Sequence, residues 1–145
     1  DSEYLTAFDQ VVIPVAQAFK PDIVLVSCGF DAAQGDPLGR YRLTPQGYAH
    51  MTRRLQALPS AQGRVLAVLE GGYNLDAVAE SSAAVVETLL GRAVSPLVDL
   101  PAPHKAAAEA IAHVRAIHAA AGLLLAKDDD DDNTGGGGGG GGGDV

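Results

Sequence analysis

Two short apolar runs separated by a helical segment limit the possible folds of this chain more than any other feature. Residues 22–28 contain the run Ile-Val-Leu-Val, and residues 64–69 read Arg-Val-Leu-Ala-Val-Leu. Such uninterrupted apolar runs are typical of parallel strands that are covered on both faces. The segment between them, 45–58, has apolar residues at helical spacing, which predicts a βαβ unit with two parallel strands.

Helices are also expected over 4–19 and 75–90, and an Ala-rich helix is expected over 103–126. Pro14 predicts a kink in the first of these. Thr44 followed by Pro45 predicts the N-cap and first turn of the helix over 45–58. The fold class is therefore α/β. Because two strands do not form a stable sheet by themselves, we expect part of the domain to be missing from this sequence.

The net charge of −8 comes mainly from residues 128–145, which hold six of the 18 acidic residues and no Lys or Arg. This segment, an Asp run followed by nine glycines, is predicted to be disordered. Two interpretations of it stay open: an acidic tail that meets a basic partner such as a histone, or a repeat expansion without a function. The rest of the chain is nearly neutral and has no basic stripe, which argues against direct nucleic-acid binding.

Other features exclude several classes of protein. No apolar run approaches the ~20 residues that span a bilayer, so no membrane association is expected. The single cysteine, Cys28, excludes an internal disulfide framework and favours a reducing compartment. The N-terminus reads Asp-Ser-Glu-Tyr, without the features of a signal peptide, and is interpreted as a cut inside a longer chain.

Functional side chains are expected in the two loops that follow the predicted strands, because sites of open α/β sheets lie at the carboxyl ends of strands. In the first loop, residues 29–43, Asp31 has a carboxylate suited to zinc or magnesium; the alternative is a role in capping a turn. In the second loop, residues 70–74, a pair of glycines permits a sharp bend or the close approach of a substrate. Tyr73 can donate a hydrogen bond to a developing oxyanion, or it can be a core tyrosine.

Asp36 is expected to form a turn by accepting hydrogen bonds from backbone N–H groups. Leu38 stands exposed in a polar loop, which indicates either the rim of an apolar pocket or local packing under the loop. His113 and His118 are five residues apart and therefore lie on different faces of a helix, so the spacing does not favour a zinc-binding pair. No Ser-His-Asp arrangement of a hydrolase is indicated.

Three motifs in these segments resemble the zinc-dependent histone deacetylase family. They read PDIVLVSCGFDAAQGDPLG from Pro21, LTPQGYAHMT from Leu43 and LEGGYNL from Leu69. Their order and spacing make the match specific over roughly residues 1–91, and their sequences are most similar to class II, closest to class IIb. The resemblance implies a three-layer α-β-α fold with a mostly parallel sheet, of the arginase/deacetylase-like kind, which is incomplete here.

The resemblance implies Zn²⁺ as the cofactor, with Asp31 as a metal ligand and Tyr73 as the catalytic residue that polarises the acetyl carbonyl. It also implies substrate contacts for four residues: Gly71, Gly72, Leu38 and Phe30. Relatives that prefer polyamines carry Glu at the position of Leu38, so a leucine there favours acetyl-lysine in histones or other proteins. The implied reaction is zinc-assisted hydrolysis of the acetyl amide, with a histidine as general base.

The family's other two zinc ligands, in an Asp-x-His motif, and its His-His general-base pair do not occur in this sequence. We therefore expect the 145 residues alone to be inactive and poorly folded. Two alternatives stay open: a non-catalytic interaction module derived from this fold, and a deacetylase that acts on small acetylated amines.

The expected domain organisation has three parts. Residues 1–91 form the C-terminal part of the catalytic domain, residues 92–127 form a connector and the Ala-rich helix, and residues 128–145 form the tail. The resemblance further implies an intracellular protein of the nucleus or cytoplasm that acts in chromatin and transcription regulation. The implied partners are an acetylated histone or another acetyl-lysine protein and a corepressor complex.

Overall fold

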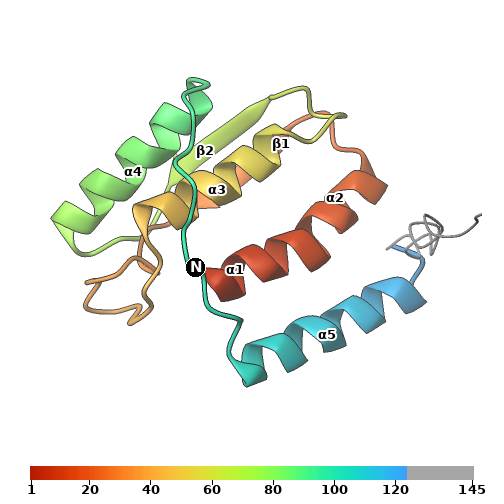
Figure 1. Cartoon of the computed structure of the whole chain (residues 1–145). Coiled ribbons are helices and arrows are strands. Elements are labelled where there is room, and N and C mark those ends of the chain that lie inside the picture. The colour runs from red at the N-terminus through yellow and green to blue at the C-terminus, as the bar shows by residue number, and fades with distance from the viewer. Residues whose placement is uncertain (124–145) are drawn as a thin grey trace, which may run out of the picture.

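The computed structural model of the chain describes residues 1–123 (Figure 1). Its elements follow one another as α1 (Ser2–Ala7), η1 (Phe8–Val12), α2 (Ile13–Phe19), β1 (Val24–Cys28), α3 (Pro45–Gln56), β2 (Val65–Leu69), α4 (Leu75–Leu89) and α5 (Lys105–Ala120). Helices and strands thus occur where the sequence predicts them, with ends that differ by a few residues, and the α/β class is confirmed. The predicted disordered tail lies outside the described residues.

The two strands form a parallel sheet, as predicted, and pair with each other over their full lengths. Side chains alternate between half-buried and exposed along β1 and along β2 as far as Val68, after which Leu69 is exposed as well. Leu25 is 69% exposed, and Leu66 and Val68 are each 52% exposed. The expectation that both faces of the strands are covered is therefore wrong for residues 1–123, because the described residues supply no layer over the second face.

The first helical segment changes its hydrogen-bond pattern just before Pro14. Between α1 and α2 lies η1, a π-helical turn in which the Ile13 N–H donates to the Phe8 carbonyl. Because Pro14 has no N–H, it removes one bond of the regular α-helical ladder, and a wider turn accommodates this loss. The helix is therefore irregular just before Pro14, and the kink predicted there stays a prediction. Lys20, in the left-handed conformation with φ 56°, ends α2.

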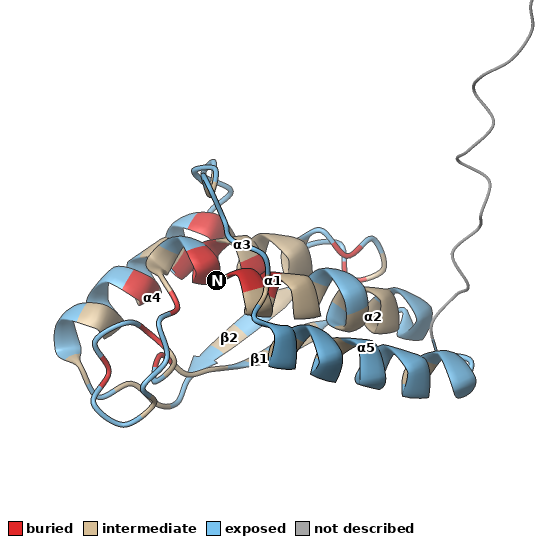
Figure 2. Cartoon of the chain, turned by 60° about the horizontal axis from the view of Figure 1, so that its bottom comes forward, coloured by how far each residue is buried: buried red, intermediate tan, exposed pale blue. Residues whose placement is uncertain are grey.

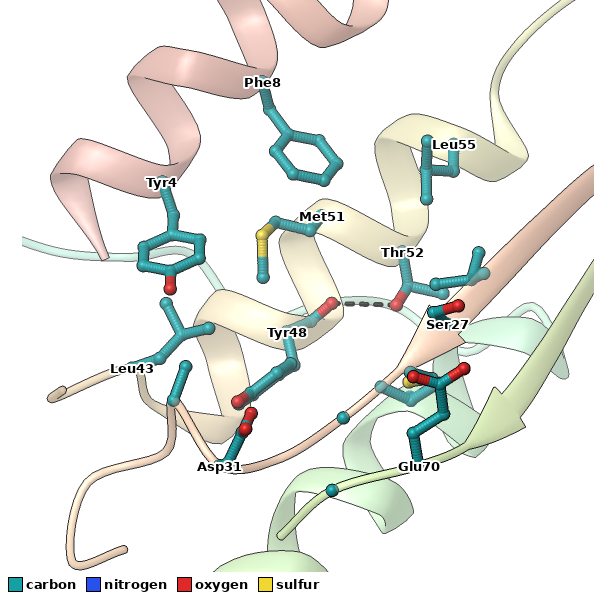
Figure 3. A pocket seen from close by; sticks show the side chains of 16 residues that line it. Tyr4, Phe8, Ser27, Asp31, Leu43, Tyr48, Met51, Thr52, Leu55 and Glu70 are labelled. Atoms are coloured by element: carbon teal, nitrogen blue, oxygen red, sulfur yellow. Dashed lines mark hydrogen bonds between the residues drawn. The ribbon is translucent and has the colours of Figure 1, made fainter. Parts of the chain in front are cut away.

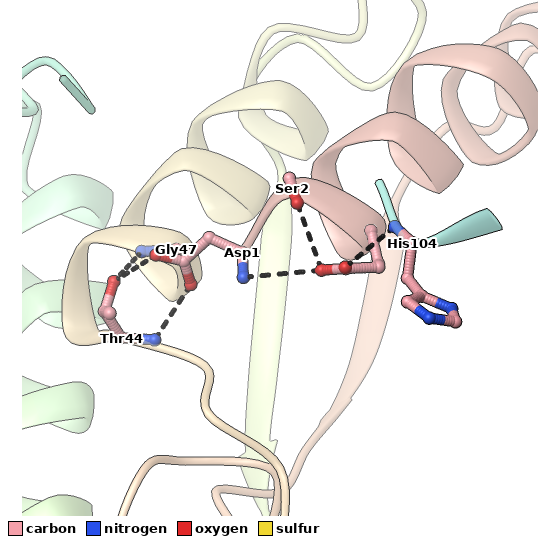
Figure 4. A network of polar contacts seen from close by, with 6 residues as sticks. Asp1, Ser2, Thr44, Gly47 and His104 are labelled. Carbon is pink, nitrogen blue, oxygen red and sulfur yellow. Dashed lines mark hydrogen bonds and ion pairs between the residues drawn. The ribbon is translucent and has the colours of Figure 1, made fainter. Parts of the chain in front are cut away.

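The N-terminus of α3 is held by a polar network (Figure 4). Thr44 is the N-cap, as predicted, and its Oγ1 accepts a hydrogen bond from the Gly47 N–H at 3.0 Å. The Asp1 carboxylate in turn accepts hydrogen bonds from the Thr44 N–H at 2.9 Å and the Thr44 hydroxyl at 2.7 Å. In the first turn of α1, Glu3 accepts from the His104 N–H at 3.2 Å, which attaches the segment before α5 to α1.

The hydrophobic core lies between α1, α3, α4 and the first loop rather than on the strands, and α5 stays largely exposed (Figure 2). Its buried residues are Leu5, Phe30, Ala33, Leu43, Tyr48, Met51 and Val85. The Ala-rich helix α5 packs along α1 and η1 (Figure 1). None of the helices described for residues 1–123 has the length and apolar character that crossing a membrane requires.

Candidate functional site

The two loops predicted to carry the site meet at the carboxyl ends of β1 and β2. The Phe30 N–H donates to the Gly71 carbonyl at 2.8 Å, and the Glu70 N–H donates to the Cys28 carbonyl at 3.4 Å. These bonds continue the parallel pairing of the strands beyond their last residues. The loops 29–43 and 70–74 therefore form one continuous surface at this edge of the sheet.

Asp31 is exposed, and its carboxylate lies between one glycine from each loop. A Cβ atom added at Gly29 would lie 3.3 Å from Asp31 Oδ1, and one added at Gly71 would lie 3.2 Å from Oδ2. Gly39 approaches the backbone of Asp31 so closely that an added Cβ would overlap the Asp31 carbonyl oxygen. The absence of side chains at Gly29 and Gly71 leaves room for the Asp31 carboxylate. The absence of a side chain at Gly39 lets its backbone lie against the backbone of Asp31.

A cavity of about 360 Å³ opens beside Asp31 (Figure 3). Its walls come from α1, η1, β1, both loops and α3, and Val85 of α4 closes it. Tyr4, Phe8, Leu43, Met51 and Leu55 give the walls an apolar character, whereas Asp31 and Glu70 contribute carboxylates. Of the predicted site residues, Asp31 and Gly71 line this cavity.

Tyr48 of α3 extends toward Asp31 inside this cavity (Figure 3). It is 6% exposed, and within residues 1–123 its hydroxyl has no hydrogen-bond partner. Burial raises the pKa of the Tyr48 phenol well above its ordinary value, and nearby Tyr4 and Asp31 raise it further. The hydroxyl therefore stays protonated and presents a donor next to the Asp31 carboxylate.

Asp36 is buried, at 6% exposure, and accepts three backbone hydrogen bonds. Its Oδ1 accepts from the Leu38 N–H at 2.8 Å and the Gly39 N–H at 2.9 Å, and its Oδ2 accepts from the Tyr73 N–H at 2.8 Å. Burial alone raises the pKa of this carboxyl, but the hydrogen bonds from the three amides outweigh burial and hold the pKa below its ordinary value. The predicted turn-forming role of Asp36 is confirmed.

The remaining predicted site residues are Tyr73, Leu38, Gly72 and Phe30. The side chains of Tyr73 and Leu38 are 58% and 65% exposed, and neither lines the cavity beside Asp31. Gly72 has φ +131°, a conformation that favours glycine, and an added Cβ would meet Val78 Cγ2 at 2.6 Å. Phe30 is buried, at 3% exposure, with its ring 5.0 Å from that of Tyr48. A substrate contact of Phe30 stays a prediction.

A catalytic zinc requires about three protein ligands and an open position. Within residues 1–123, no group of three or more His, Cys, Asp or Glu side chains gathers closely enough to hold a metal ion. Asp31 presents one carboxylate, and neither His113 nor His118, both on α5, lines the cavity beside it. The described residues therefore do not form a zinc site by themselves.

Sequence reasoning missed two features of this region. The first is the position of the Tyr48 hydroxyl, which lies beside the Asp31 carboxylate although no hydrogen bond joins the two (Figure 3); a polar tip on an apolar helix face was the available signal. The second is the bond between Asp36 and the Tyr73 backbone, for which the sequence offers no signal across 37 positions.

Comparison with known proteins identifies similar chains. The family model described as histone deacetylase domain matches residues 1–89. The histone deacetylase clr3 of Schizosaccharomyces pombe is 56% identical over 91 residues, which cover 63% of this chain and 13% of that protein. The polyamine deacetylase HDAC10 of Mus musculus is 48% identical over 115 residues, which cover 79% of this chain and 17% of that protein.

A solved structure has the same arrangement of elements. The structure of the histone deacetylase Clr3 superimposes with a TM-score of 0.74 at 50% sequence identity, covering 79% of this chain and 19% of that one. This likeness supports the incomplete three-layer α/β fold. The chain spans less than a fifth of the length of each of these two relatives and of the solved Clr3 chain.

Proposed function

Because the chain belongs to the histone deacetylase family, in its class II branch, we propose that it supplies part of the active site of a zinc-dependent deacetylase. The reaction is hydrolysis of the acetyl amide of acetyl-lysine. The observation that carries this proposal is the junction of the two loops, in which Gly71 lies against the Asp31 carboxylate two positions before Tyr73.

In this proposal Asp31 is one zinc ligand, and the remaining ligands and the general base belong to residues other than 1–123. Its position supports this role, because the carboxylate is exposed and is free of any strong cation partner among the described salt bridges. A zinc ion supplies a Lewis acid and an activated water when it is bound in such a site. Tyr48 beside Asp31 is suited to hydrogen-bond the carboxylate and hold its orientation.

Tyr73 is proposed to donate a hydrogen bond from its hydroxyl to the acetyl carbonyl oxygen as negative charge develops there. Its exposed side chain and firmly held backbone support this role. One donor of this kind contributes on the order of 3 kcal/mol to lowering the barrier. The donor is effective because it is positioned before the reaction begins.

The substrate is proposed to enter between the two loops. Gly71 and Gly72 have no side chains that would block this passage. Leu38 gives its rim an apolar, uncharged side chain, which suits the methylene stem of acetyl-lysine better than a polyamine cation. An acetylated histone or another acetyl-lysine protein is therefore the proposed substrate, with a corepressor complex as the proposed assembly and the nucleus or cytoplasm as the proposed location. The similarity to a polyamine deacetylase keeps small acetylated amines as the competing substrate class.

The test is a chimera in which residues 1–89 replace the matching segment of the Schizosaccharomyces pombe relative. We expect the chimera to deacetylate acetyl-lysine peptides faster than acetylated polyamines. Substituting Tyr73→Phe should lower kcat by about 100-fold, the size of one lost oxyanion donor.

The matched control is Tyr41→Phe, since Tyr41 lies in the first loop, is 60% exposed and contacts Tyr4 edge to face. This variant should retain its activity. A folded chimera with no turnover would favour the non-catalytic module, and a preference for acetylated polyamines would overturn the proposed substrate.

A further inference from the structure

Two contacts with the first loop hold the chain at Tyr73 and Asn74, one through the Tyr73 backbone N–H and one through the Asn74 side chain. On one side, the Tyr73 N–H donates to Asp36 Oδ2 at 2.8 Å. On the other side, Asn74 Nδ2 donates to the Gly35 carbonyl at 2.9 Å, while Asn74 Oδ1 caps the first turn of α4. The backbone of Tyr73 is therefore fixed although its side chain is exposed.

Of these two contacts, the one to Asp36 has the stronger physical basis. An ionised carboxylate accepts from a backbone N–H about twice as strongly as a neutral acceptor does. The Asp36 side chain is 6% exposed, so water does not readily replace the Tyr73 N–H. Its other oxygen already accepts from the Leu38 and Gly39 amides, which fixes the carboxylate itself.

The two oxygens of the Asp36 carboxylate also accept hydrogen bonds from different loops. Oδ1 serves the loop that carries Leu38, and Oδ2 serves the loop that carries Tyr73. Gly72 has φ +131°, and because it is a glycine the backbone before Tyr73 can adopt conformations that other residues rarely adopt. A fixed acceptor after such a glycine limits the directions in which the Tyr73 side chain can point.

We infer that Asp36 is a positioning residue for the proposed reaction: its buried carboxylate holds the Tyr73 backbone so that the phenol hydroxyl is already aimed when substrate arrives. This inference rests on the proposed function of Tyr73. A positioning role differs from a merely structural one, because Asp36 then affects the rate of reaction only through the Tyr73 hydroxyl. Removing that hydroxyl should remove most of the effect of Asp36 on the rate.

The test is a double-mutant cycle in the chimera described above. Asp36→Asn keeps one oxygen for the Leu38 and Gly39 amides but turns an NH₂ group toward the Tyr73 N–H. We expect kcat to fall about tenfold, the size of one lost hydrogen bond to a charged acceptor, with KM nearly unchanged. In the Tyr73→Phe background the same substitution should change kcat less than about twofold, as expected for coupled residues.

Amide hydrogen exchange provides a readout that does not depend on turnover. The Tyr73 amide should exchange at least about tenfold faster in Asp36→Asn than in the unsubstituted chimera, because its acceptor is gone. The matched control is Asp22→Asn, since the Asp22 side chain is exposed at the opposite end of β1; it should change neither kcat nor this exchange rate. If Asp36→Asn does not fold, replacing the Tyr73 N–H by an ester oxygen removes the same bond and leaves Asp36 intact.

Additive effects in the cycle, or a rise in KM without a loss of kcat, would overturn the inference. Unchanged exchange of the Tyr73 amide would overturn it as well. A folded chimera without any turnover would count against the proposed function instead, and the exchange rates would still decide whether Asp36 holds Tyr73.

Discussion

Asp31 illustrates how single residues set the geometry of the proposed site. Its carboxylate lies between Gly29 and Gly71, each from a loop that follows a different strand. The contact distances of 3.2 and 3.3 Å to added Cβ atoms are tight but do not overlap. A methyl group at either glycine would therefore shift the carboxylate by a few tenths of an ångström rather than unfold the loops.

Gly71→Ala should therefore weaken zinc binding more than it weakens the fold. In the chimera we expect the affinity for zinc to fall by about tenfold, the lower end of what is seen when the support of a metal ligand is changed. The measurement is zinc competition against a chromophoric chelator, together with thermal unfolding. Gly71 has no positive φ, so alanine adds a contact without adding backbone strain.

Gly63→Ala is the matched control for this prediction. An added Cβ there meets nothing within 4 Å, but φ +76° makes the substitution strained. We expect a lower unfolding temperature with unchanged zinc affinity. Equal losses of zinc affinity in the two variants would mean that the contact between Gly71 and Asp31 has no special effect on the metal.

Among the single residues of the site, some features can be predicted from the sequence and others cannot. Asp31 and Tyr73 were identifiable because each lies in the loop that follows a run with a clear strand pattern, and strand ends locate sites in α/β sheets. The bond from the Tyr73 N–H to Asp36 could not be predicted, because it depends on how two loops of irregular backbone fold against each other. The position of the Tyr48 hydroxyl beside Asp31 could not be predicted either, because helical periodicity indicates which face of α3 is buried but not what a polar tip on that face lies beside.

At the scale of elements, α3 depends on a cap that reaches beyond its own segment. Thr44 satisfies the Gly47 N–H, and Asp1 of α1's N-terminus accepts from both polar groups of Thr44. An added Cβ at Gly47 would overlap the Asp1 carboxylate, so this glycine leaves room for the contact. The cap was predictable from the Thr-Pro dipeptide, whereas its support by Asp1, 43 positions away, was not.

Thr44→Ala should lower the free energy of unfolding of the chimera by about 1 kcal/mol, the usual cost of a lost N-cap. Urea unfolding followed by circular dichroism measures this change. Thr52→Ala is the control within the same helix, because its hydroxyl donates to the Tyr48 carbonyl in the preceding turn rather than to a free helix end. It should be neutral or slightly stabilising, since Ala has the higher helix propensity; a cost equal to that of Thr44→Ala would contradict the capping argument.

At the scale of the whole molecule, the main feature is the uncovered face of the sheet. It presents Leu25, Leu66 and Val68, all at least half exposed. Sequence patterning predicted apolar residues on both faces correctly, but it could not show that residues 1–123 cover only one of them. Contiguous exposed apolar surface of this kind is unusual in a stable soluble monomer, and a two-stranded sheet contributes little stability by itself.

The 145-residue chain by itself should therefore bind a hydrophobic dye such as ANS strongly and show no deacetylase turnover, even with added zinc. Substituting Leu25, Leu66 and Val68 together by threonine should reduce the dye fluorescence several-fold while the far-UV circular dichroism stays unchanged, because threonine keeps the preference for β-strands. The matched control is Val98→Thr, since Val98 is 78% exposed in the segment between α4 and α5, away from the sheet. The control should leave dye binding unchanged. Weak dye binding by the unsubstituted chain would show that the sheet face is covered in solution. Robust turnover of an acetyl-lysine peptide would show that the 145 residues suffice for a working site, although no group of three metal-ligating side chains gathers within residues 1–123.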